Sequence, residues 1–269
     1  MSAEHWGRRP RDWAELAEPS NQPLFAEVLT RLEIRPGTRL LDIGCGSGYA
    51  AAMAAGLGAS VTGIDITPEL IEIARERVPA GDFRVGTMDA LPYQDGSFDA
   101  AVGFNALQFA DDPSNAVGEA ARTVKPQGLL AATTFAEPER NESTALHLAL
   151  EPLRQAAPAG AAHAPYELSA PGGLERLLTA GAGLELVFSG EVPLAWKHDT
   201  IGHAVRAVLA SAGGAMAIEA AGEPAARAAL EQAVAPFAAP DGSVRMNNVF
   251  RYAIARRPDW GVTIRSNAA

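Results

Sequence analysis

Cysteine is nearly absent from this chain of 269 residues, where Cys45 is the only one. A single cysteine excludes an intrachain disulfide and any zinc site built on paired cysteines. The five histidines do not compensate, because none has the spacing of a metal-binding motif, and we predict no metal site. A chain without disulfides suits a reducing compartment, so we predict a cytoplasmic protein.

Long apolar runs and positive charge are also scarce. Gly, Pro and charged residues interrupt each apolar stretch before it reaches the length of a membrane span, and the N-terminus lacks the apolar segment of a signal peptide. The net charge of −10 makes nucleic acid and anionic membranes poor partners. We interpret the one basic cluster, Arg8, Arg9 and Arg11, as a solvated end.

Aromatic residues form only 6% of the chain, but the 48% hydrophobic share is enough for one large α/β domain. Strand-like and helix-like segments alternate over about 100 residues, a pattern typical of parallel strands joined by right-handed crossovers. Helices are predicted at 24–33 and after Tyr49, Thr67–Pro68 and Asp112–Pro113. The predicted strands are 39–43, 60–65, 83–87, 98–105 and 129–135.

The alternation ends after Phe135. Further helices are predicted at 143–156 and 171–180, with two more across 200–236, and strands at 184–196 and 248–257. We predict one domain: a Rossmann-like, seven-stranded, mostly parallel sheet with helices on both faces and helical cap insertions. Its parts are a core at about 37–136, completed by 172–198 and 244–258, and cap segments at about 139–171 and 199–243.

The segment LLDIGCGSGYA, residues 40–50, places Gly44, Gly46 and Gly48 directly after a strand. Glycine lets a ligand approach the backbone closely, although a tight turn without a ligand is the alternative. Asp65 ends the second strand, where a carboxylate can accept both hydroxyls of a ribose. A dinucleotide fingerprint would place its third glycine where Tyr49 stands, so the spacing disfavours a nicotinamide-dependent oxidoreductase.

LLDIGCGSG resembles the first motif of class I S-adenosylmethionine (SAM)-dependent methyltransferases, whose usual form is LDxGCGxG. The segments VTGIDITPELIEIAR, LPYQDGSFDAAVGFNALQF and EAARTVKPQGLLAATTF resemble later motifs of that family. The resemblance covers about residues 37–136 and is closest to the group that includes ubiquinone and menaquinone biosynthesis methyltransferases. It implies SAM as the cofactor and S-adenosylhomocysteine as the product.

The resemblance also implies roles at the first strand. Asp42 is expected to order the glycine loop and to meet the ammonium of the methionine moiety. Gly44, Cys45 and Gly46 are expected to lie against that moiety with their backbones. Gly48 is expected to permit close helix packing instead. A helix N-terminus lowers the pKa of a thiol, which raises a nucleophile hypothesis for Cys45, but the family gives a cysteine there no catalytic role.

Further roles follow at the next strands. Asp65 is expected to hold the ribose and Ile66 to pack on the adenine. Phe104 and Asn105, at the end of the fourth strand, are expected to line the cofactor beneath the acceptor.

The sequence departs from the family at the end of the third strand. Relatives carry an Asp or Asn there, in a segment like GDAEALPF, to bind the adenine amine, whereas this chain reads GTMDALPY. Aligned on LP, that position is Thr87. Thr87 is expected to accept from the amine and Met88 to supply a backbone amide, with Asp89 as an alternative acceptor.

The catalytic residues are less evident than the cofactor site. A general base matters when the nucleophile is an alcohol or a carbon acid, and His198 and His163 are the candidates. An ordinary structural histidine is the alternative for both. The acceptor pocket is expected to be built by the cap segments and the N-terminus, and to suit a small, mostly apolar molecule.

Methyl transfer to oxygen or carbon of such a molecule is therefore the leading hypothesis. The alternative is a SAM-binding regulatory or partner-binding module without transfer activity. We expect no nucleic-acid partner and no membrane span, and either a monomer or a homodimer.

Overall fold

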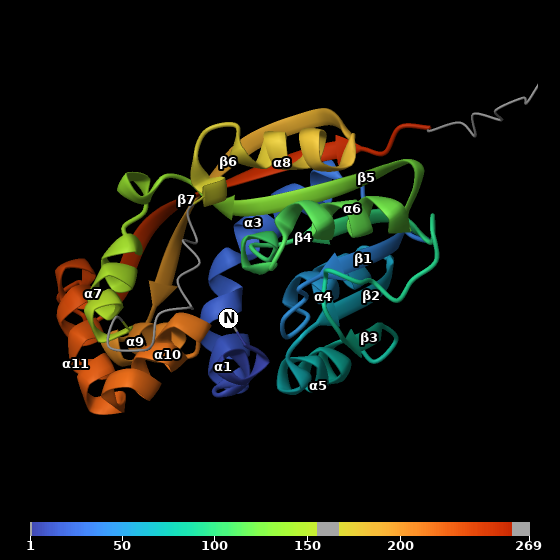
Figure 1. Cartoon of the computed structure of the whole chain (residues 1–269). Coiled ribbons are helices and arrows are strands. Elements are labelled where there is room, and N and C mark those ends of the chain that lie inside the picture. Colours follow the sequence, from blue (N-terminus) through green and yellow to red (C-terminus); the bar gives the residue numbers. More distant parts are fainter. Residues whose placement is uncertain (1, 155–166, 260–269) are drawn as a thin grey trace, which may run out of the picture.

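The structure, a computed structural model, describes residues 2–154 and 167–259. Its centre is a seven-stranded sheet of order β3-β2-β1-β4-β5-β7-β6 (Figure 1). The strands β1 to β5 pair in parallel, while β7 runs antiparallel to both β5 and β6, which confirms the predicted fold class. The strands are β1 Arg39–Ile43, β2 Ser60–Asp65, β3 Asp82–Val85, β4 Phe98–Gly103, β5 Val124–Phe135, β6 Glu185–His198 and β7 Val244–Arg256.

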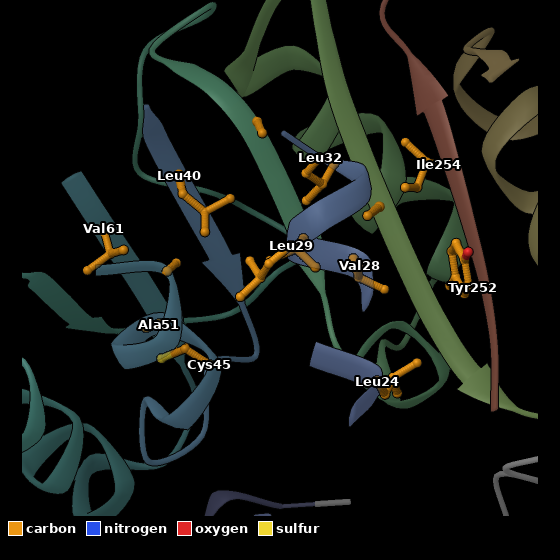
Figure 2. Packing of buried hydrophobic residues seen from close by; sticks show 14 of the residues in the cluster. Leu24, Val28, Leu29, Leu32, Leu40, Cys45, Ala51, Val61, Tyr252 and Ile254 are labelled. Atoms are coloured by element: carbon orange, nitrogen blue, oxygen red, sulfur yellow. The ribbon is translucent and has the colours of Figure 1, made fainter. Parts of the chain in front are cut away.

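The central strands are mostly apolar because helices cover both faces of the sheet. Leu40 of β1 packs in one core with side chains of α3, α4 and α5, and the next residue, Leu41, packs in a second core with α6 and α8. Figure 2 shows Leu29 of α3 facing β1 in the first core. The covering helices are α3 Gln22–Arg31, α4 Tyr49–Gly56, α5 Pro68–Arg77, α6 Pro113–Thr123 and α8 Gly173–Ala182.

Two predicted helix starts have different caps. The Asp112 side chain accepts hydrogen bonds from the N–H groups of Ser114 and Asn115, as expected for an N-cap of α6. Thr67 precedes α5 as predicted, and its hydroxyl is of the type that caps helices, but its side chain makes no capping bond to α5. The carboxylate of Asp65 instead accepts from the Thr67 N–H at 2.9 Å.

Strand β5 begins at Val124, earlier than the predicted start at 129. Val124 pairs with Phe98, but the next paired residue, Leu129, lies opposite Ala100. The KPQG segment between them is therefore a bulge, and Gln127 adopts φ 64° within it.

The strands β6 and β7 continue beyond the end of β5 and carry a helical cap. The last pair between β5 and β7 is Phe135 with Phe250, whereas residues 193–198 pair with residues 244–249 past the end of β5. A third core joins the cap helices to this extension (Figure 1). The cap helices are α7 Thr144–Arg154, α9 Ile201–Leu209, α10 Ala212–Ala221 and α11 Glu223–Val234.

Residues 200–236 form three helices, and the prediction of two was wrong. The Ser211 hydroxyl caps α10, and Gly222, with φ 82°, separates α10 from α11. Pro224 then stands in the first turn of α11, where its missing N–H costs nothing. Within the described residues no single helix is long and apolar enough to span a membrane, and α9 with α10 reaches that length only as a pair bent by 88°.

Residues 2–21, here called the N-terminal cover, fold as short helices: α1 Ala3–Gly7, α2 Pro10–Asp12, a π-helical turn Trp13–Ala17 and a 3-10 turn Glu18–Asn21. In Figure 1, α1 lies between α5 and α10, and it contacts both. The basic cluster is therefore not a free solvated end, because each of its arginines pairs with another element. These pairs are Arg8 with Glu219, Arg9 with Glu223 and Arg11 with Glu76.

Candidate cofactor site

The strand order brings the predicted cofactor residues to one edge of the sheet. Strands β2, β1 and β4 are neighbours, and their parallel direction places their carboxyl ends together. The glycine loop, residues 44–48, follows β1, Asp65 ends β2, and Phe104 follows β4. This is the edge at which ligands bind in open α/β sheets.

The glycine loop packs too closely against its neighbours for side chains. Gly44 and Gly48 have φ 69° and 75°, a region that favours glycine. A Cβ on Gly44 would lie 2.5 Å from the Cβ of Ala106, in the turn after β4. A Cβ on Gly48 would lie 2.9 Å from the Cβ of Ala74, so Gly48 permits the close packing of α4 on α5, as expected.

Asp65 is joined to the glycine loop. Its Oδ2 accepts from the Gly46 N–H at 2.9 Å, and its Oδ1 accepts from the Thr67 N–H. Burial raises the pKa of Asp65, and the hydrogen bonds from Thr67 and Gly46 oppose that shift. The exposed face of Ile66, 36% accessible, lies next to this carboxylate in the chain.

Asp42 carries a buried oxygen without a partner. The side chain is 2% exposed, and its Oδ1 makes no hydrogen bond. Burial, followed by the charges of Glu18 and Asp65, raises the pKa of Asp42 to about 8. A nearby cation stabilises the ionised form of such a buried carboxyl group. The ammonium group of a ligand would supply that cation.

Cys45 lies in the loop as a packing residue. It is 6% exposed, and its Sγ would be 2.8 Å from a Cβ on Gly63. Burial, followed by the charges of Asp42 and Asp65, raises the pKa of the thiol well above its usual value. The thiolate needed for a nucleophile is therefore disfavoured, and the structure gives no support to that hypothesis.

The turn after β3 joins the two candidates for adenine recognition. The Thr87 hydroxyl donates to Asp89 Oδ2 at 2.9 Å and accepts from the Asp89 N–H at 3.2 Å. Asp89 Oδ1 is buried and has no hydrogen-bond partner. The Met88 methyl group would lie 3.8 Å from a Cβ on Gly44, so this turn lies beside the glycine loop.

The turn after β4 is fixed by β5. Asn105 adopts φ 49°, its N–H donates to the Thr133 hydroxyl at 2.9 Å, and its Oδ1 accepts from that hydroxyl at 3.0 Å. The Phe104 ring packs on Phe25 of α3, with centroids 4.6 Å apart.

The two candidate bases have different outcomes. His163 lies outside the described residues. His198 ends β6, and because Trp196 stands two residues earlier, both side chains lie on the same face of the strand. Burial and then the charge of His203 lower the pKa of His198, which favours the neutral imidazole. A third histidine, His147 of α7, was not singled out in the sequence, and burial lowers its pKa to about 4.

Sequence reasoning also missed Glu18, Ser47 and Arg77, which meet at the glycine loop. Glu18 is 7% exposed although it stands in an N-terminal segment rich in charge. Its Oε1 accepts from the Ser47 N–H at 2.8 Å, and its Oε2 lies 3.1 Å from Arg77 Nη1. The sequence carries no periodic signal for this contact, because Glu18 and Ser47 come from separate elements.

Two shallow hollows lie away from this edge. One, of about 440 Å³, lies between α3 and β6 around Glu27 and Val192, and the other, of about 350 Å³, lies on the β6–β7 extension around Lys197 and Arg245. None of the predicted cofactor residues lines either hollow, so we assign the site from the loop geometry.

Comparisons with known proteins also point to the segment that contains the glycine loop. Residues 41–132 match the model of the methyltransferase domain family. An uncharacterized protein of Mycobacterium tuberculosis (strain ATCC 25618 / H37Rv) is 34% identical over 156 residues, 56% of each chain. The ubiquinone biosynthesis O-methyltransferase of Xanthomonas oryzae pv. oryzae (strain PXO99A) is 40% identical over 113 residues, 40% of this chain and 47% of that protein. The chain thus covers about half the length of these relatives.

Solved structures share the fold. The [4+2]-cyclase SpnF has a TM-score of 0.56 at 23% identity, over 87% of this chain and 80% of that one. A SAM-dependent methyltransferase from Aquifex aeolicus has a TM-score of 0.50 at 19% identity, over 68% and 92%. The class is therefore that of the Rossmann-like α/β proteins. Within it, residues 41–132 form a methyltransferase domain, and SAM is the cofactor of such domains.

Proposed function

We propose that this protein transfers the methyl group of SAM to a small, mostly apolar molecule, at oxygen or carbon. The observation that carries the proposal is the glycine loop surrounded by buried carboxylates at the ligand edge of a methyltransferase domain. SAM supplies a methyl group already activated on a cationic sulfur, so the protein's main tasks are to align the reactants and to exclude water.

The charges around the loop suit a cationic ligand. Asp42 and Glu18 are buried near it and Asp65 is half-buried, and each raises the pKa of Cys45 through its charge. Arg77 pairs with Glu18, which leaves the other two carboxylates for the ligand. We propose that Asp42 Oδ1 meets the ammonium of the methionine moiety, while the backbones of Gly44, Cys45 and Gly46 line that moiety.

We propose that Asp65 holds the ribose, that Ile66 packs on the adenine and that Met88 supplies a backbone amide to it. The free oxygen of Asp89 is the better acceptor for the adenine amine, because the Thr87 hydroxyl already donates to Asp89. Thr87 thus positions Asp89. Asp89, and not Thr87, would take the place of the Asp or Asn that relatives carry at this turn. Phe104 and Asn105 are proposed to line the cofactor on the acceptor side.

Aromatic rings support an apolar acceptor. Phe104 and Phe25 pack together, and at the end of β5 the ring of Phe135 contacts those of Trp196 and His147, with centroids 6.1 and 6.3 Å away. Such rings suit a flat apolar molecule. His198 is our proposed base for an acceptor that must lose a proton, since its lowered pKa keeps it neutral.

The test has two stages. Calorimetry with SAM, S-adenosylhomocysteine and NAD should show binding of the first two, and binding of NAD alone would favour an oxidoreductase. Methyl-labelled SAM should then label a member of a panel of phenols, quinols and amines. Binding of SAM without labelling of any acceptor would favour the regulatory module instead.

A further inference from the structure

We propose that Glu18 is a positioning residue: it fixes the glycine loop through Ser47 and so couples closure of the N-terminal cover to the binding of SAM. The inference rests on the proposed function, because it concerns the same loop. It adds a residue far from the family's motifs to the machinery of cofactor binding.

The Glu18 carboxylate reaches the loop from the cover. Its Oε1 accepts from the Ser47 N–H at 2.8 Å and from the Trp13 indole N–H at 3.0 Å, and its Oε2 accepts from the Ser47 hydroxyl. A Cβ on Gly46 would collide with Glu18 Oε1. The carboxylate therefore lies directly against the loop, in space that glycine at position 46 leaves open.

Arg77 completes the junction from α5. Its Nη1 lies 3.1 Å from Glu18 Oε2 and donates to the Ser47 carbonyl at 2.9 Å, while its Nη2 donates to the Ala14 carbonyl at 3.2 Å. A buried ion pair is stable only when further hydrogen bonds satisfy both groups, and this one meets that condition. One guanidinium thus holds the loop, the cover and the carboxylate between them.

The cover also joins the parallel strands and their helices to β6 and the cap helices. The Trp6 ring packs on Phe109, in the turn after β4, with centroids 5.6 Å apart. The Trp196 indole N–H donates to Asn21 Oδ1 at 3.1 Å, which joins the cover to β6. Figure 1 shows α1 between the core helix α5 and the cap helix α10. The cover therefore lies over the edge where the cofactor residues gather.

These contacts make loop and cover one mechanical unit. Residues 44–46 are proposed to bind the methionine moiety, and Ser47, the next residue, is held by Glu18. If the closed cover favours the binding-competent loop, SAM must favour the closed cover by the same factor, because coupling between two sites is reciprocal. Arg8 and Arg11 stand in the cover, so trypsin cleavage after them reports on its opening.

The test uses Glu18→Gln, which keeps the side chain's size and removes the charge that holds Arg77. We expect the Kd for SAM, measured by calorimetry, to rise about tenfold, a typical size for such coupling. We also expect SAM to slow trypsin cleavage after Arg8 and Arg11 in the wild type, and to slow it much less in the variant. Trp13→Phe removes one hydrogen bond to Glu18 and should give a smaller change of the same kind.

Glu76→Gln is the matched control. It removes the pair between Glu76 and Arg11, which also joins the cover to α5, but whose side chains are 57% and 60% exposed. Exposed pairs contribute little, so its Kd for SAM should stay within about twofold of the wild type. A Glu18→Gln protein with a lower Tm but unchanged Kd and unchanged protection by SAM would overturn the inference. Failure of the wild type to bind SAM would instead overturn the proposed function.

Discussion

Asp65 accepts a hydrogen bond from the backbone N–H of Gly46 at 2.9 Å, so the carboxylate that ends β2 is tied to the loop that follows β1. The residue proposed to hold the ribose therefore also shapes the site of the methionine moiety. Changes at Asp65 should accordingly affect both halves of the cofactor site.

Asp65→Ala should lower SAM affinity about 10- to 100-fold, the range expected when hydrogen bonds to a charged group are lost. Calorimetry with SAM measures the effect. Asp65→Asn keeps one oxygen acceptor and should be intermediate, and alanine at the exposed Asp111 should bind SAM normally. Unchanged affinity of Asp65→Ala would contradict the assignment.

Asp42 should make stability depend on pH. Its pKa is raised from 3.8 to about 8 in the folded protein, so the folded state binds its proton more tightly. The stability it contributes is fully present below about pH 4 and is lost as the pH rises through about 8. Denaturant titrations at several pH values, for the wild type and Asp42→Asn, isolate this effect.

The wild type should lose more stability than Asp42→Asn between about pH 5 and pH 9, by a few kcal/mol, because one pKa unit corresponds to about 1.4 kcal/mol. Asp42→Asn should also bind SAM more weakly, since it lacks the charge that meets the ammonium. If the stability of the two proteins changed with pH in the same way, the pKa of Asp42 would not be raised in the folded protein.

Asp89, more than Thr87, should read the adenine amine. S-inosylhomocysteine replaces that amine with a carbonyl oxygen, and the wild type should bind it more weakly than S-adenosylhomocysteine. Asp89→Ala should narrow the difference in affinity between the two ligands, because a lost hydrogen bond to a charged group changes affinity about tenfold or more. Thr87→Val should keep most of that difference. The opposite ranking in competition calorimetry would assign the amine to Thr87.

Cys45 should be chemically inert in the folded protein. Burial raises the pKa of its thiol well above the usual value, so iodoacetamide at about pH 8 should label it only after unfolding. Cys45→Ala should bind SAM like the wild type, with about 1 kcal/mol less stability from the lost packing. Rapid labelling of the native protein, followed by mass spectrometry, would reverse this view.

The local patterns of the sequence predict the core of this fold well. The ranges 39–43 and 60–65 coincide with β1 and β2, because each is a short segment with apolar residues at its centre and turn residues on both sides. Asp112 caps α6 as its side chain and the following proline indicate. The close helix packing expected at Gly48 is also found, where the backbone lies against Ala74.

Other features depend on contacts between distant segments, which periodicity does not record. Glu18 is buried because Ser47 and Arg77 meet it, and the charged sequence around it predicts an exposed end. The third helix of residues 200–236 is different, because Gly222 and Pro224 are local signals of a helix break that the prediction of two helices overlooked. Thr67 has the residue type of a cap, but its side chain makes no capping bond to α5, and its own N–H donates to Asp65.

The overhang of β6 and β7 past Phe135 has a consequence for how such proteins diversify. The helices α7, α9, α10 and α11 rest on a two-stranded stem, whereas the glycine loop, Asp65 and Asp89 belong to the five parallel strands. Replacing the helices on that stem would leave those strands intact. Chimeras that exchange residues 199–243 between relatives should therefore change which acceptor molecules are methylated, while the strands proposed to bind SAM are kept.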